Sequence, residues 1–124
     1  MSRSDIKPAR QIKLNAFLMA TGHHVAAWRH PDVPLQAGLG FAHYKALAQT
    51  AERAKFDGVF LADSVGIRDA SASQTLHRSA RVSGFEPLTL LSALAAVTER
   101  VGLIATVSTT YNEPYHVARK FASL

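Results

Sequence analysis

The sequence predicts an α/β protein that begins as a parallel βα barrel, and three observations support this prediction. Short apolar runs typical of buried strands alternate with helical patterns, which implies right-handed crossovers and a parallel sheet. Long polar segments, residues 20–40 and 63–84, follow the first two strands, whereas the turns from helix to strand are short, as in barrels. No GxGxxG motif follows the first strand, which disfavours the alternative, a doubly wound dinucleotide-binding sheet.

The first strand is expected after a polar leader over residues 1–11. Residues 12–19 (IKLNAFLM) are mostly apolar, with Lys13 and Asn15 on one alternating face, which predicts a strand. Residues 20–40 carry several Gly and Pro residues, which interrupt regular structure and predict a long loop. Loops of this length in compact domains usually serve a function.

A helix and a second strand follow this loop. Residues 41–55 have apolar side chains at three- and four-residue spacings with charged ones between them, the pattern of an amphipathic helix. Residues 59–62 read VFLA, a short apolar run typical of a strand that is covered on both faces. The polar stretch 63–84 then predicts a second long loop.

The remaining elements repeat this order as helix, strand and helix. Phe85-Glu86-Pro87 opens a helix, because Pro at an early helical position loses no hydrogen bond. Residues 103–107 (LIATV) predict the third strand, and Asn112-Glu113-Pro114 starts a third helix in the same way. No C-terminal Gly or Asn ends that helix before Leu124. We therefore expect residues 12–124 to form the N-terminal three βα units of an incomplete (β/α)8 TIM barrel that is truncated at its C-terminus.

Composition limits the class of protein. The 124 residues are 48% hydrophobic and 19% charged, as in globular proteins. The chain has no cysteine, and no apolar run approaches the roughly 18 residues of a membrane helix. We therefore expect a cytoplasmic protein with no membrane partner. The formal charge is +5, but much of it lies in the leader and no basic helix face follows, so nucleic acid is not an expected partner.

Polar side chains follow the second and third predicted strands. Asp63 comes directly after VFLA, at the rim where barrel enzymes keep their binding and catalytic groups. The alternative is that Asp63, or Ser64 beside it, only forms a turn. Thr106, Ser108 and Thr109 lie at and just past the end of the third strand, where hydroxyls could hydrogen-bond a heteroaromatic edge. Strand propensity is the alternative, and it explains Thr106 better than it explains the run of hydroxyls.

The loop after the first strand gathers His23, His24 and Trp28. Adjacent histidines cannot easily bind one ion, and no further ligand follows them at helical spacing, so no metal site is predicted. An aromatic ring beside polar groups suits the wall of a ligand pocket. The sequence has no Ser-His-Asp signature, nucleophile elbow or Walker loop, so it identifies no catalytic residue.

Three segments in this order resemble the bacterial-luciferase-like flavin monooxygenases. The resemblance is to the subgroup that contains nitrilotriacetate monooxygenase component A and dibenzothiophene sulfone monooxygenase. The segments are residues 14–32 (LNAFLMATGHHVAAWRHPD), 51–64 (AERAKFDGVFLADS) and 85–124 (FEPLTLLSALAAVTERVGLIATVSTTYNEPYHVARKFASL). The resemblance implies a luciferase-like TIM barrel several times longer than this chain.

The resemblance also implies an activity for the whole protein. Such enzymes use O2 and reduced FMN, supplied by a separate flavin reductase, to oxygenate a small organic substrate, which leads to C–N or C–S bond cleavage. Asp63 and the Ser108-Thr109 region, with Thr109 favoured, would contact the flavin. The loop that holds the two histidines and Trp28 would lie over the flavin on its substrate side. Members commonly form homo-oligomers.

The part of the barrel beyond Leu124 bears on these expectations. Barrel phosphate sites are usually built after the seventh and eighth strands, so we expect the 124-residue chain alone to bind FMN weakly and to be inactive. A truncated, non-catalytic remnant or interaction fragment is one alternative. A deazaflavin-dependent oxidoreductase on the same type of barrel is another.

Overall fold

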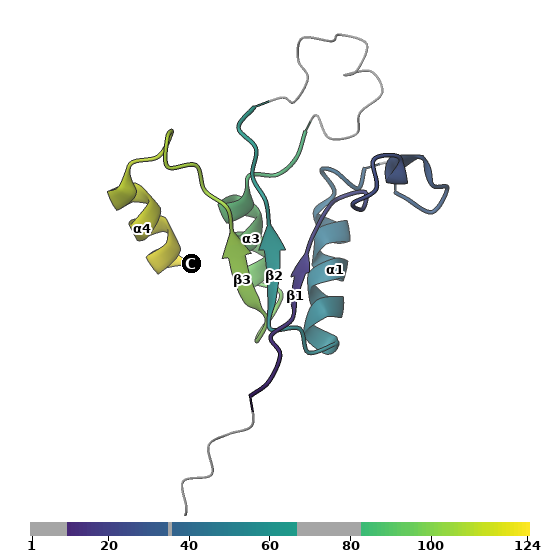
Figure 1. The fold of residues 1–124 in the computed structure, drawn as a ribbon, viewed down its shortest axis with the longest axis horizontal. Helices are drawn as coiled ribbons and strands as arrows, with labels where there is room; N and C mark the ends of the chain where they lie inside the picture. Colours follow the sequence, from purple (N-terminus) through teal and green to yellow (C-terminus); the bar gives the residue numbers. More distant parts are fainter. Residues whose placement is uncertain (1–9, 35, 67–82) are drawn as a thin grey trace, which may run out of the picture.

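A parallel sheet of three strands organises the chain (Figure 1). The computed structural model describes residues 10–34, 36–66 and 83–124, so residues 1–9 of the leader and residues 67–82 of the second long loop lie outside it. The strands are β1 (Asn15–Phe17), β2 (Gly58–Leu61) and β3 (Gly102–Ala105), and β2 is central. Both pairs of neighbours are parallel, as the sequence predicts.

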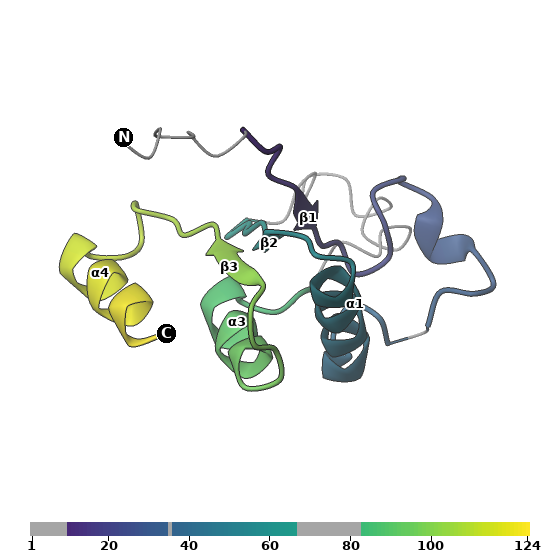
Figure 2. The same ribbon diagram turned by 90° about the horizontal axis from the view of Figure 1, so that it is seen from below.

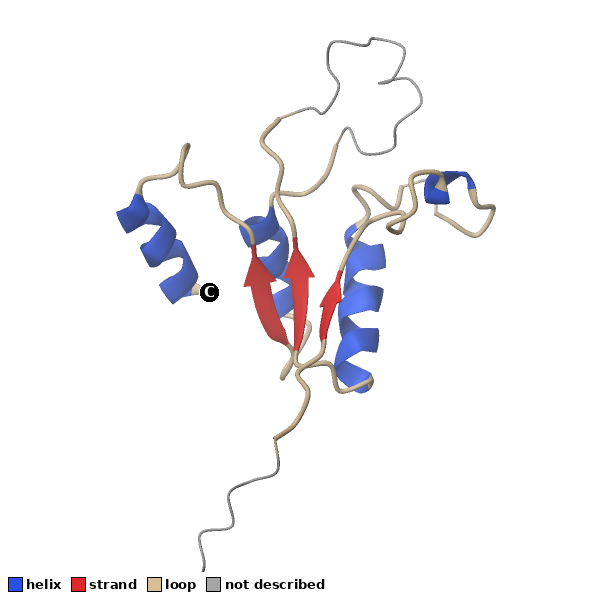
Figure 3. Cartoon of the chain, in the orientation of Figure 1, coloured by secondary structure: helices blue, strands red, loops and turns tan. Residues whose placement is uncertain are grey.

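Two helices cover one face of this sheet. Figure 2 shows α1 (Phe41–Arg53) and α3 (Pro87–Ala95) on the same side of the strands, while α4 (Pro114–Ser123) lies apart beyond β3. The predicted alternation of strands and helices is thus confirmed (Figure 3). One short 3-10 helix, η1 (Ala27–Arg29), interrupts the loop after β1, which the sequence predicts as irregular.

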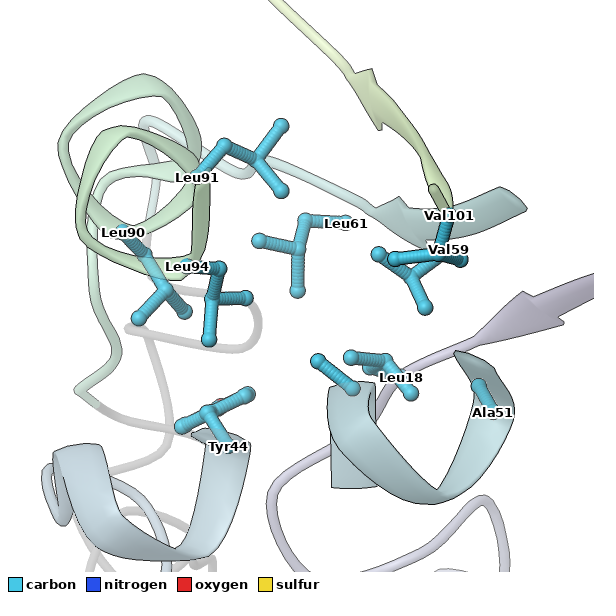
Figure 4. Close-up of a cluster of buried hydrophobic side chains, with 10 residues drawn as sticks. Leu18, Tyr44, Ala51, Val59, Leu61, Leu90, Leu91, Leu94 and Val101 are labelled. Atoms are coloured by element: carbon cyan, nitrogen blue, oxygen red, sulfur yellow. The ribbon is translucent and has the colours of Figure 1, made fainter. Parts of the chain in front are cut away.

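The hydrophobic core lies between the sheet and these two helices (Figure 4). Leu91 and Leu94 of α3, Ala48 of α1 and Val59 of β2 have no exposed surface. Burying a leucine side chain contributes about 1.5–3 kcal/mol, so α3 is the main source of this stabilisation. The short side chain of Ala48 lets α1 approach the strands closely.

The opposite face of the sheet is apolar but open. Side chains alternate across a strand, so Phe60 lies on the other side of β2 from Val59 and Leu61. The register places Phe17, Phe60 and Ile104 in one row across the three strands. Phe17 is 42% and Ile104 39% exposed, and the centroids of the Phe17 and Phe60 rings are 4.8 Å apart. We call these three residues the open face.

Two carboxylates tie the amino end of the sheet together. The Glu52 Oε1 atom, near the end of α1, accepts hydrogen bonds from the backbone N–H groups of Glu99, Arg100 and Val101 at 2.8, 2.6 and 3.1 Å. The bond from Arg100 contributes most, and together these bonds lower the pKa of Glu52. This carboxylate fixes the turn that leads into β3.

Asp57 makes the corresponding link between β1 and β2. Its carboxylate accepts from Lys13 Nζ at 2.9 Å and from the Leu14 N–H at 2.8 Å. The Asp57 N–H in turn donates to the Leu14 carbonyl at 2.8 Å. The Lys13 bond, followed by the Leu14 bond, lowers the pKa of Asp57.

The element boundaries differ slightly from those the sequence predicts. β1 is shorter than residues 12–19, although the ladder continues through a bond from the Leu18 N–H to the Phe60 carbonyl at 2.9 Å. β3 ends at Ala105 rather than at residue 107, while the Thr106 N–H still donates to the Leu61 carbonyl at 3.0 Å. The helix predicted for residues 41–55 ends early because Lys55 adopts a left-handed φ of 61°.

Candidate functional site

Asp63 lies at the carboxyl end of the sheet, just past the central strand β2. It is half-buried, and its carboxylate has no hydrogen bond or ion pair with any residue of the described chain. Ser64 forms the local turn instead, because its Oγ donates to the Gly66 carbonyl at 2.9 Å. Of the two residues for which a turn-forming role is possible, Ser64 takes it within the described residues.

Three hydroxyl residues lie past the end of β3, the strand that pairs with β2. Thr106 and Ser108 are half-buried and Thr109 is exposed. By alternation from Ile104, Thr106 lies on the same side of the sheet as the open face. No hydrogen bond joins any of these three hydroxyls to another described residue. The edge therefore presents one carboxylate acceptor and several hydroxyl groups after neighbouring strands.

Asn112 holds the segment that carries the hydroxyls. Its Nδ2 donates to the Ser108 carbonyl at 2.9 Å, and the side chain is half-buried. The bond closes the turn between β3 and α4. From the sequence, Asn112 is predicted only to be part of a helix start. Asparagine commonly hydrogen-bonds nearby backbone in turns, and this tendency is the signal that could have identified its role.

The loop after β1 folds back onto the open face through His23. Its Nε2 lies 3.0 Å from the Phe17 carbonyl, and its ring meets the Phe17 ring edge-on with centroids 4.8 Å apart. Phe17 in turn contacts the Phe60 ring in a tilted arrangement, so the three rings form a continuous aromatic row.

His24 and Trp28 occupy different surroundings. His24 is exposed, and its Nδ1 accepts from the Ala26 N–H at 3.1 Å, so it stabilises a turn of the loop. Trp28 lies in η1, is 37% exposed, and carries the Arg29 guanidinium over its ring at 5.3 Å from the centroid. Of the three loop residues predicted to face the substrate, only His23 contacts the open face.

Trp28 instead lines a surface hollow of about 480 Å³. We call it the Trp28 hollow. Its lining comes from the loop after β1 and from the start of the segment that leads into α3: Thr21, Trp28, Val33, Pro34, Gln36, Gly38, Leu39 and Ser83. The hollow and the edge that carries Asp63 are thus two separate features of the carboxyl end.

The described residues contain neither a metal-binding cluster nor a membrane-spanning helix. No group of three or more His, Cys, Asp or Glu side chains in residues 10–34, 36–66 and 83–124 could hold a metal ion. Within the same ranges, no helix is long and apolar enough to cross a membrane.

Comparison with protein families gives a match over most of the chain. The family model described as "Luciferase-like monooxygenase" matches residues 17–124. The N-acetyl-S-(2-succino)cysteine monooxygenase of Bacillus subtilis is 57% identical over 115 residues, which are 93% of this chain and 25% of that protein. The chain therefore spans about a quarter of the length of this curated relative.

Two further relatives belong to the subgroup that the sequence resembles. Nitrilotriacetate monooxygenase component A of Aminobacter aminovorans is 41% identical, with 93% of this chain and 27% of that protein covered. Dibenzothiophene-sulfone monooxygenase of Rhodococcus erythropolis is also 41% identical, with 93% and 26% covered. These matches confirm the resemblance drawn from the three sequence segments.

Solved structures extend the comparison to the fold. A long-chain alkane monooxygenase superposes with a TM-score of 0.81 at 38% identity, covering 94% of this chain and 28% of that one. A riboflavin lyase, solved with modified FMN and riboflavin, gives a TM-score of 0.73 at 30% identity, with 92% and 27% covered. The predicted fold class, the first three βα units of a luciferase-like TIM barrel, is confirmed.

Proposed function

Because the chain belongs to the luciferase-like monooxygenase family, we propose that the whole protein is a two-component monooxygenase that uses reduced FMN and O2 to oxygenate a small organic substrate. We propose further that this chain supplies one side of the flavin site. The observation that carries this second proposal is the half-buried Asp63 carboxylate, which has no partner among the described residues at the carboxyl end of the central strand. Charged groups held in this way at strand ends of barrels are usually binding or catalytic groups.

The residues at this edge fit a flavin chemically. A flavin ring system offers an N–H donor and carbonyl acceptors along one polar edge, and its remaining area is largely apolar. The Asp63 carboxylate can accept from the N–H, and the hydroxyls of Ser108 and Thr109 can donate to the carbonyls. The modified FMN named for the riboflavin lyase structure supports FMN as the flavin.

When bound, reduced FMN would supply the two electrons with which one atom of O2 enters the substrate and the other leaves as water. The chain's own residues hold and shield the site. Asn112 fixes the backbone that presents Ser108 and Thr109. The open face, extended by His23, provides an apolar wall that keeps water away from the reacting atoms.

We propose a carboxylated thioether or amine as the substrate class, with cleavage of a C–S or C–N bond. The 57% identical relative is named for N-acetyl-S-(2-succino)cysteine, and a 41% identical one for nitrilotriacetate. Both names denote small molecules that carry several carboxylates. A separate flavin reductase would supply the reduced FMN. We expect the whole enzyme to form a homo-oligomer in the cytoplasm, where the absence of cysteine in this chain would suit reducing conditions.

The Asp63→Asn variant tests the flavin site. The expected result is an FMN dissociation constant at least about tenfold higher, because a hydrogen bond to a charged acceptor contributes about 1.5–3 kcal/mol. Fluorescence titration of the full-length protein with FMN measures the constant. Ser64→Ala is the matched control and should leave it unchanged, since Ser64 serves only the turn. Equal affinity in wild type and Asp63→Asn would remove Asp63 from the site.

Turnover tests the reaction. The full-length protein, supplied with a flavin reductase, NADH, FMN and O2, is expected to consume N-acetyl-S-(2-succino)cysteine, with nitrilotriacetate as a second substrate. Product analysis by mass spectrometry detects cleavage, and ¹⁸O₂ should label one product oxygen. A protein that binds no FMN and shows no turnover would instead match a non-catalytic remnant.

A further inference from the structure

We propose that Asn112 is a positioning residue of the flavin site: it holds the Thr109 hydroxyl where that group can donate to the flavin, and it does not touch the flavin itself. The inference rests on the proposed function and deepens it, because it makes the affinity for FMN depend on a residue outside the ligand-contacting groups. The observation that carries it is the hydrogen bond from Asn112 Nδ2 to the Ser108 carbonyl at 2.9 Å.

The chain leaves the sheet just before Thr109. Within the described residues, the Thr106 N–H makes the last hydrogen bond from this segment to β2, to the Leu61 carbonyl at 3.0 Å. The next element, α4, begins at Pro114 and adds no side chain to the described core. Residues 107–113 therefore connect a fixed strand to a helix that the core does not hold, so their path depends on contacts within the connection itself.

Asn112 supplies the side-chain contact within this connection. In the described part of the chain, it is the only one of residues 106–113 whose side chain makes a hydrogen bond. The bond joins residues that are four positions apart and spans the turn formed by residues 109–111. Because the Asn112 side chain is half-buried, water competes less for this bond than at a fully exposed position.

Thr109 is the hydroxyl residue whose position depends most on this turn. Its side chain is exposed, so little packing fixes it, whereas the Ser108 side chain is half-buried. The backbone just before Thr109 is held by the bond from Asn112 to the Ser108 carbonyl. A hydroxyl that is fixed before the ligand arrives loses less conformational freedom on binding, so its hydrogen bond then contributes more to affinity.

Equilibrium binding of FMN to the full-length protein tests the proposal without turnover. Asn112→Leu keeps the approximate size of the side chain and removes the donor, and it is expected to raise the FMN dissociation constant about fivefold, the loss typical of one neutral hydrogen bond. Asn112→Gln keeps the amide and should recover part of this loss. Glu113→Gln is the control and should match wild type, because Glu113 is the adjacent residue and its side chain makes no capping hydrogen bond.

A double-substitution cycle separates positioning from a general loss of structure. Thr109→Val removes the hydroxyl that Asn112 positions, so adding Asn112→Leu to it should change the FMN dissociation constant by less than about twofold. In an Asp63→Asn background, Asn112→Leu should keep its full effect, since Asp63 follows a different strand.

Infrared difference spectra of bound FMN provide a second readout. A carbonyl band of the flavin moves to lower wavenumber when a hydroxyl donates to that carbonyl. Asn112→Leu and Thr109→Val should therefore each move one carbonyl band to higher wavenumber, and the double variant should move it no further than Thr109→Val alone.

The inference and the proposed function can fail separately. When wild type binds FMN, an unchanged affinity in Asn112→Leu overturns the inference alone. Equal effects of Asn112→Leu with and without the Thr109 hydroxyl do the same, and so do carbonyl bands that stay in place while affinity falls. A wild-type protein that binds no FMN overturns the proposed function, and the inference with it.

Discussion

The two ends of the sheet are built in opposite ways. At the amino end, the Glu52 carboxylate accepts three hydrogen bonds and the Asp57 carboxylate two, and β2 and β3 begin at closely packed glycines. At the carboxyl end, Asp63 has no partner within the described chain, Thr109 is exposed, and the loop after β1 leaves a hollow. Both ends therefore carry carboxylates, but among the described residues only those of the amino end have hydrogen-bond partners.

The residues that stabilise the fold thus lie at the amino end of the sheet, and the candidate binding residues lie at the carboxyl end. Carboxylates that accept backbone N–H groups fix the turns between helix and strand, and their hydrogen-bonding capacity is used up. A carboxylate without such bonds adds little to the fold and can serve a ligand. In barrels the amino-terminal face generally supports stability and the carboxyl-terminal face carries the active site, and this chain follows that division.

The largest effect on stability is expected for a substitution that disturbs the close packing at the amino end. A Cβ atom added at Gly102 would lie 2.8 Å from the Asp57 carbonyl oxygen, a backbone atom that cannot easily move. We expect Gly102→Ala to lower the free energy of unfolding by about 1–3 kcal/mol, as overpacking typically does. Urea unfolding of the expressed protein, followed by circular dichroism, measures the change.

Gly84→Ala provides the contrast at the carboxyl end. Apart from the chain neighbours of Gly84, no atom of the described residues lies within 4 Å of a Cβ added there, so this variant should keep the wild-type unfolding free energy to within about 0.5 kcal/mol. Equal losses at Gly102 and Gly84 would show that the two ends do not differ in packing.

The next largest effect is expected for Glu52, whose contribution to the free energy of unfolding depends on pH. Its pKa is lowered in the folded state, above all by the backbone hydrogen bond from Arg100. Stability from Glu52 is therefore present above the unfolded-state pKa of about 4.3 and is lost as the pH falls through the lower folded-state value. Glu52→Gln should lower the urea midpoint at pH 7, and its difference from wild type should shrink as the solution is acidified.

Glu113→Gln tests whether any exposed glutamate would behave in this way. Glu113 precedes α4 and its side chain makes no capping hydrogen bond, so this variant should match wild type at every pH. A pH-independent difference between Glu52→Gln and wild type would mean that Glu52 acts through packing rather than through its charge.

The fold was largely predictable because hydrophobic periodicity reports burial directly. VFLA identified β2, and the spacing in residues 41–55 identified α1. The exact strand ends were not predictable, since a strand extends only as far as its neighbour pairs with it, as the bond from Thr106 to Leu61 past the end of β3 illustrates. Strand pairing depends on two segments that are distant in the sequence, so it cannot be predicted from either segment alone.

The candidate site was predictable in position but less so in detail. Placement after an apolar run identified Asp63, because the end of a buried strand can be read from sequence. Whether Asp63 or Ser64 forms the turn depends on where the chain goes next, and that required coordinates. The role of Asn112 and the place of Arg29 against Trp28 likewise arise from loop geometry that periodicity does not encode.

The smallest expected effect is a gain in stability at the amino end. Lys55 follows α1 in a left-handed conformation with φ of 61°, and the backbone closes the helix with bonds from Lys55 N–H to the Glu52 carbonyl and from Phe56 N–H to the Ala51 carbonyl, both 3.0 Å. Glycine usually occupies this position, because a side chain there costs about 1 kcal/mol. We expect Lys55→Gly to raise the free energy of unfolding by about 0.5 kcal/mol, since the greater freedom of glycine in the unfolded chain offsets part of the gain.

Lys45→Gly is the control for Lys55→Gly, because the two substitutions are expected to change the free energy of unfolding in opposite directions. Lys45 lies inside α1, where glycine costs about 1 kcal/mol relative to good helix formers, so the same substitution should there lower the urea midpoint. A midpoint that falls for both variants would mean that the Lys55 side chain itself stabilises the amino end. A rise at Lys55 alone would show that the amino end, for all its hydrogen bonds, still contains one strained residue whose replacement leaves the carboxyl end and its ligand groups untouched.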